Sequence, residues 1–141
     1  MAEAFALAAS ALAVIELSAK VTKTCTQYAK DVSGAKEDVE RLQTEVKGLD
    51  VAAKNVQRLA NTSSKTTLNT LKELQPTMED CKKCLESLQA ALSPGKRKAA
   101  MSKFGMRALT WPFKSKDLEK ILADLSRLMQ SISVAMQVDQ T

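Results

Sequence analysis

Apolar residues recur along this chain with alternating spacings of three and four, which is the period of one helix face. Four stretches follow a helical pattern of this kind, and each predicts a helix that buries one stripe against its neighbours. The stripes are Leu7, Ala11, Val14, Ser18, Val21, Cys25, Tyr28 and Val32; Val39, Leu42, Val46, Leu49, Ala53, Val56 and Ala60; Leu68, Leu71, Met78, Cys81, Leu85, Leu88 and Leu92; and Leu118, Ile121, Leu125, Leu128, Ile132 and Ala135.

Turn-forming residues separate these stretches, at Ser33-Gly34, at Asn61-Thr62-Ser63-Ser64 and at Ser93-Pro94-Gly95. Pro76 lies inside the third stretch, so a kink or break is expected there. Long helices with short connections predict an all-α fold, an antiparallel bundle of four main helices plus a short connecting helix, in one domain spanning residues 1–141. An elongated coiled coil is the alternative, but the regular breaks favour a chain that folds back. The expected helices cover about 3–32, 35–61, 65–92 and 116–138, with the short helix at about 98–109.

The opening stretch is more apolar than a surface helix requires. Between Ala4 and Ile15 the only polar side chain is Ser10. With successive residues about 100° apart on a helix, a second apolar stripe points away from the first one. It consists of Phe5, Ala8, Leu12, Ile15 and Ala19, and the same side turns polar from about Glu16 onward, with Lys20, Lys23, Gln27 and Lys30. Such a helix has to be central in a bundle, covered by a partner, or in contact with lipid.

This stretch differs from a signal peptide and from a standard membrane span. It carries Glu3 where a signal peptide has a basic region. A helix from Ala4 to Ile15 would be about 18 Å long, whereas the hydrocarbon core of a bilayer is about 30 Å thick. The stretch is therefore predicted to be too short to cross a membrane alone.

The net charge of +5 is concentrated in one segment. Residues 87–116 carry seven basic residues and no acidic one, and these surround Phe104, Met106, Trp111 and Phe113. Basic residues mixed with Trp and Phe suit the headgroup layer of a membrane, although a solvated basic loop is the ordinary alternative. Nucleic acid is not expected as a partner, because no recognised binding motif accompanies the patch. The expected contacts to anionic lipid are Lys96, Arg97, Lys98, Lys103, Arg107 and Lys114.

The residue types argue against catalysis. The chain has no histidine, the commonest general base and metal ligand, and no Gly-x-Ser-x-Gly motif. Cys81 and Cys84 have the spacing of a redox or zinc motif, but zinc needs four ligands and only Cys25 could join them. We interpret the cysteines as small packing residues in a reducing compartment. No enzyme activity, no metal and no cofactor are expected.

Three segments carry a resemblance to a known family: "LAVIELSAKV", "DVERLQTEV" and "ALTWPFKSKDLEKILADLSRL" with the following "ISVAMQVDQT". They resemble the N-terminal HeLo-like domain of fungal STAND proteins, the NOD-like receptors of fungi. Trp111, Pro112 and Phe113, shortly before the last long helix, are the most specific part of the resemblance.

The resemblance implies a helical bundle followed in the same longer chain by a NACHT or NB-ARC domain. It also implies an effector domain that induces regulated cell death. In the single copy the first helix would be sheltered among its neighbours; homo-oligomerisation would release it, and Phe5, Ala8, Leu12 and Ile15 would enter a membrane with anionic lipids. The domain would be cytoplasmic and would move to the plasma membrane on activation. The alternative is a non-lytic module that binds another copy or a helical adaptor.

Overall fold

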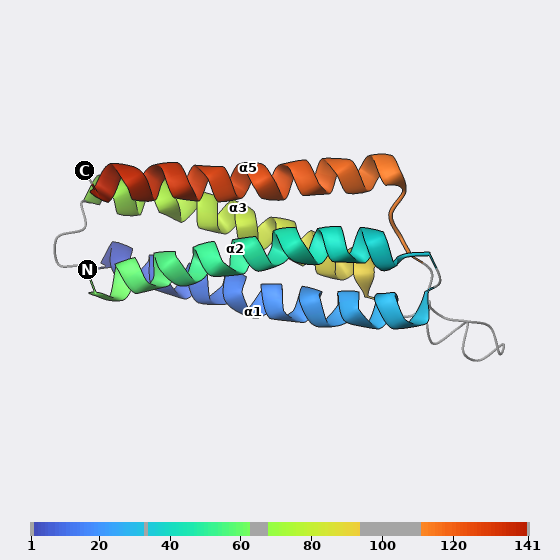
Figure 1. The fold of residues 1–141 in the computed structure, drawn as a ribbon. Helices are drawn as coiled ribbons and strands as arrows, with labels where there is room; N and C mark the ends of the chain where they lie inside the picture. The colour runs from blue at the N-terminus through green and yellow to red at the C-terminus, as the bar shows by residue number, and fades with distance from the viewer. Residues whose placement is uncertain (1, 33, 63–67, 94–110, 141) are drawn as a thin grey trace.

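The computed structural model describes residues 2–32, 34–62, 68–93 and 111–140, and all regular structure in these ranges is helical. The four helices are α1 (Ala2–Asp31), α2 (Lys36–Thr62), α3 (Leu68–Leu92) and α5 (Ser115–Gln140), shown in Figure 1. The predicted all-α class with four long helices is therefore confirmed. The predicted short helix at 98–109, and every expected lipid contact except Lys114, lie outside the described residues.

The helices form an elongated bundle in which each has two main neighbours (Figure 1). α1 packs against α2 and α3, and α5 packs against the same two helices. Consecutive helices run in opposite directions, but α2 and α3 lie on a diagonal and touch only slightly. As a result the neighbours α1 and α3 run parallel, and so do α2 and α5. Hydrogen bonds show this direction directly, since Ser10 meets Gln75 and Thr24 meets Gln89 further along both helices.

α1 occupies a corner of the bundle. Within the described residues it has no contact with α5, which lies on the opposite diagonal corner. A central position, one of the three explanations for its apolar first half, is therefore wrong. One side of α1 has to face away from the bundle.

The core consists largely of the predicted stripes. Ile121 is an exception, because it is half-buried while its neighbour Leu122 is buried in its place. Leu74 was not part of the predicted third stripe and is fully buried. Each such side chain contributes about 1.5–3 kcal/mol when it leaves water, so the stripes supply the main driving force for bundling. The largest fully buried side chains are Leu7, Val14, Val21, Leu42, Leu49, Leu74, Met78, Leu85, Leu92, Leu118, Leu125 and Ile132.

α3 continues through Pro76, so the predicted break there is wrong. Proline removes one backbone donor and leaves the carbonyl of Lys72 without its helical partner. Pro76 is exposed, whereas Leu74 and Met78 on either side of it are fully buried. The freed carbonyl is thus on the water side of the helix, and burial of the flanking residues keeps the helix continuous.

Aromatic rings close the end of the bundle where α1 and α3 finish. Tyr28 donates a hydrogen bond from its hydroxyl to the carbonyl of Leu92, 2.5 Å away. The Tyr28 and Trp111 rings meet edge to face with centroids 5.5 Å apart, and Trp111 and Phe113 do the same at 5.3 Å. The Trp111-Pro112-Phe113 segment therefore connects the start of α5 to the ends of α1 and α3.

Removing the Tyr28 hydroxyl should weaken this end of the bundle. The Leu92 carbonyl lies in the last turn of α3, where it has no intrahelical donor. We expect Tyr28→Phe to lower the free energy of unfolding by about 1–2 kcal/mol in guanidinium denaturation. A variant as stable as the wild type would mean that the hydrogen bond contributes nothing.

Replacing Ser18 should have the opposite effect. Its side chain is 1% exposed and its hydroxyl has no hydrogen-bond partner among the described residues. We expect Ser18→Ala to raise the free energy of unfolding by about 1 kcal/mol, because an unpaired buried hydroxyl is lost and alanine favours helix. Ser131→Ala is the control, since the exposed Ser131 hydroxyl bonds to the Arg127 carbonyl. A loss of stability in Ser18→Ala would contradict the prediction.

Candidate functional site

The first half of α1 presents apolar side chains to solvent. Phe5 is 80% exposed, Leu12 is 45% exposed, and Ala9 between them is exposed as well. These three residues are called the apolar strip below. The other large hydrophobic residues exposed in the described structure are single ones, Val51 in α2 and Val134 in α5.

The four residues that the sequence predicted to enter a membrane differ in their exposure. Phe5 and Leu12 are on the surface, whereas Ala8 is half-buried and Ile15 is half-buried against the core. The expectation that these residues are sheltered in the single copy is therefore wrong for Phe5 and Leu12. Their entry into a membrane stays a prediction.

Side-chain hydrogen bonds on both flanks fix the rotation of α1. On the α3 side, Ser10 donates to Glu79 Oε1 at 2.9 Å, and Gln75 Nε2 donates to Ser10 Oγ at 2.9 Å and to Glu79 Oε1 at 3.2 Å. Because the Ser10 hydroxyl is both donor and acceptor, a rotation of α1 would break several bonds together. This network keeps the apolar strip turned away from the bundle.

A glutamine from α2 holds the other flank. Gln43 Nε2 donates to the carbonyl of Thr22 at 3.0 Å and to Thr26 Oγ1 at 2.9 Å. Gln43 and Gln75 were not among the residues predicted from the sequence to have a role. The available signal was their position, since both are long polar residues one place beyond a buried leucine, Leu42 and Leu74 respectively.

By length and composition, the segment Ala4–Asp31 could cross a membrane, and it is the one such helix in the described chain. The predicted limit of about 18 Å considered Ala4 to Ile15 alone. One third of the most apolar window is buried in the bundle, and core helices of soluble proteins pass the same test. The apolar strip is the more specific observation, because Phe5 is 80% exposed and Leu12 45% exposed in the bundle.

The three cysteines pack inside the bundle or at its edge. Cys25 and Cys81 are fully buried, and loss of hydration raises the pKa of each thiol to about 12. Cys84 is half-buried; burial and then the nearby Asp124 carboxylate raise its pKa. Within the described ranges no three His, Cys, Asp or Glu side chains gather as metal ligands do. The thiols are therefore neutral near pH 7 and weak nucleophiles.

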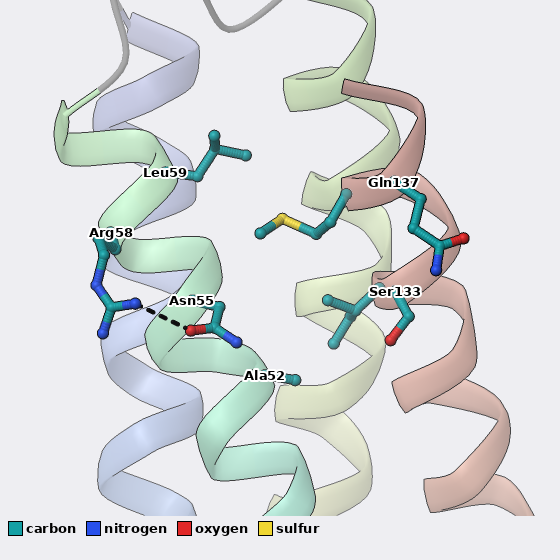
Figure 2. A pocket seen from close by; sticks show the side chains of 8 residues that line it. Ala52, Asn55, Arg58, Leu59, Ser133 and Gln137 are labelled. Atoms are coloured by element: carbon teal, nitrogen blue, oxygen red, sulfur yellow. Dashed lines mark hydrogen bonds between the residues drawn. The ribbon is translucent and has the colours of Figure 1, made fainter. Parts of the chain in front are cut away.

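A shallow groove of about 510 Å³ lies between α2 and α5 (Figure 2). Leu59 points from α2 toward α5, and Arg58 donates a hydrogen bond to Asn55 Oδ1 at 3.2 Å. Its described lining mixes apolar and uncharged polar groups with one cation, which suits an apolar side chain more than an acid–base reaction. The lining residues are Ala52, Asn55, Arg58, Leu59, Ile132, Ser133, Met136 and Gln137.

Comparison with protein families matches residues 2–139 to the family described as "Pigment biosynthesis cluster protein PigL N-terminal", a fungal family of N-terminal domains. This agrees loosely with the resemblance to a fungal HeLo-like domain. The link to a NACHT-containing STAND receptor stays a prediction. No curated protein and no solved structure matches the chain.

The burial of the thiols predicts their reactivity. In the folded protein at pH 8, Ellman's reagent should modify Cys84 first and leave Cys25 and Cys81 largely unmodified, because their pKa values lie far above this pH. In guanidinium all three should react at similar rates. Since folding raises the pKa of Cys25 and of Cys81 from 9.0 to about 12, the stability that these two thiols contribute is complete below pH 9 and is lost as the pH rises toward 12. Rapid modification of Cys25 in the folded protein would contradict this account.

Proposed function

The chain belongs to the PigL N-terminal family, and we propose that it is an N-terminal effector domain of a fungal NOD-like receptor that acts in regulated cell death. The observation that carries the proposal is the exposed apolar strip on a helix at a corner of the bundle. The receptor would hold a NACHT or NB-ARC domain in the same longer chain. The domain would rest in the cytoplasm and act at the plasma membrane.

Oligomerisation would activate the domain because it presents several apolar strips to the membrane at the same time. Complete burial of a Phe or Leu side chain stabilises by about 1.5–3 kcal/mol, and Leu12 is already partly covered. One copy would therefore bind a bilayer weakly. Several copies held together would bind far more tightly, because the second and later contacts become intramolecular.

In this proposal the bundle attaches to the membrane without opening. Phe5 and Leu12 already face outward, while the Ser10, Gln75 and Glu79 network holds α1 in place. Release of α1 from the bundle on oligomerisation, which was expected from the sequence, is therefore not a required first step. α1 would leave the bundle after attachment only if its core stripe, which begins at Leu7, were more stable in the membrane than in the bundle.

A non-lytic interaction module is the second candidate, and the groove between α2 and α5 favours it. A helix of a second copy or of an adaptor could place one apolar side chain beside Leu59, Ile132 and Met136. The mass of the protein by size-exclusion chromatography with light scattering, with and without anionic vesicles, separates the two candidates. A stable dimer that ignores lipid would support the interaction module.

Charging the apolar strip should abolish membrane attachment. We expect the double variant Phe5→Glu, Leu12→Glu to lose co-sedimentation with vesicles, vesicle leakage and growth arrest in fungal cells, because two carboxylates would have to leave water. Circular dichroism should show an unchanged helix content, since both side chains are exposed.

The matched control is Val51→Glu, Val134→Glu, which places the same two charges at apolar residues of α2 and α5 that are 57% and 60% exposed. This variant should bind and permeabilise vesicles like the wild type. Leakage that persists in the folded double variant would overturn the proposal.

A further inference from the structure

We infer that the second half of α1 binds the headgroups of anionic lipids through Lys20, Lys23 and Lys30. This inference rests on the proposed function and adds its electrostatic part. The electrostatic attraction to the membrane then comes from the same helix as the apolar strip, in addition to the basic segment 87–116.

Spacing puts these cations in line with the apolar strip. Phe5, Leu12, Lys23 and Lys30 follow one another at intervals of 7, 11 and 7 positions on one continuous helix. Each interval is close to a whole number of helical turns, so the four side chains lie within about 20° of one line. All four are exposed. Lys20 lies about 60° to the side of this line and is exposed as well.

The three lysines are not engaged in ion pairs within the described structure, in contrast to Arg41, which pairs with Glu119, and Lys54, which pairs with Asp50. Glu16 is the exposed acid between the apolar strip and the lysines. Asp31, at the end of the helix, accepts a hydrogen bond from Gln27 at 2.6 Å. The outward side of α1 thus changes from apolar to cationic along its length.

A bilayer surface with anionic lipids satisfies both halves of this line. Phe5 and Leu12 would enter the boundary between headgroups and acyl chains, as in helices that lie in the membrane plane. The lysine stems would extend along that boundary with their ammonium groups at lipid phosphates and carboxylates. A nucleic acid would neutralise the lysines but would leave Phe5 and Leu12 in water. The axis of α1 would therefore lie along the membrane rather than across it.

The size of the effect follows from surface electrostatics. Each lysine near an anionic bilayer strengthens binding about fivefold, so three lysines together give about a hundredfold. Salt should weaken this part of the binding strongly, because the lysines are exposed and screened by ions.

The test compares two triple variants that remove the same charge. In the first, Lys20, Lys23 and Lys30 are replaced by Gln; in the control, the exposed Lys72, Lys83 and Lys120 of α3 and α5 are replaced by Gln. Partition coefficients are measured by co-sedimentation with vesicles of phosphatidylcholine, with and without phosphatidylserine. We expect the first variant to lose about a hundredfold of the phosphatidylserine-dependent binding and to show a smaller salt dependence. The control should keep both, and replacing the same three α1 lysines by Arg should also keep both.

Equal weakening in both triple variants would overturn the inference, because net charge and not the line on α1 would then be responsible. Unchanged binding in the α1 lysine variant would also overturn it. If Phe5→Glu, Leu12→Glu still abolishes attachment in that case, the proposed function stands without the lysines. If wild-type protein binds neither vesicle, both the inference and the proposed function fail.

Discussion

A helix at the corner of a four-helix bundle can bury the sides that face its two neighbours and leaves the rest in solvent. α1 touches α2 and α3 but not α5 in the described structure, so this limit applies to it directly. Its first half is apolar almost all round, and the excess has to appear on the surface as Phe5 and Leu12. The exposure of these two side chains is therefore a consequence of packing geometry combined with composition.

The polar contacts beside α1 decide which of its sides is exposed. A helix that is apolar on several sides could rotate with little change in buried area. Ser10 bonded to Gln75 and Glu79 on one flank, and Thr22 and Thr26 bonded to Gln43 on the other, are satisfied in one rotation only. Buried or half-buried polar groups lose several bonds if they shift, which makes them effective at selecting one arrangement.

Much of the fold could be predicted from periodicity, because a stripe such as Leu7, Val14 and Val21 belongs to one helix and needs no knowledge of its neighbours. Which helices are neighbours is a different question. The stripes of α2 and α3 do not reveal that these helices lie on a diagonal, since any apolar stripe can face any other. For the same reason the angle of Phe5 and Leu12 predicted that they point away from the first stripe, whereas their exposure and the half-burial of Ala8 and Ile15 depend on where the adjacent helices lie.

The continuity of α3 at Pro76 shows a second limit. Proline lowers the local preference for helix, but the burial of Leu74 and Met78 acts on the same segment and is a property of the whole bundle. The local sequence alone does not show whether the low helix preference of proline or the burial of Leu74 and Met78 prevails, because it does not reveal that Pro76 faces water.

Trp111 gives the molecule an optical reporter of its own state. It is the single tryptophan of the chain, and its ring rests against Tyr28 near the end of α1, many residues away from Phe5. Its fluorescence therefore depends on whether the last turns of α1 stay packed in the bundle. The indole is too far from the apolar N-terminal end of the helix to report on that end directly. The fluorescence of this one indole can distinguish a bundle that binds a bilayer intact from a bundle that opens on it.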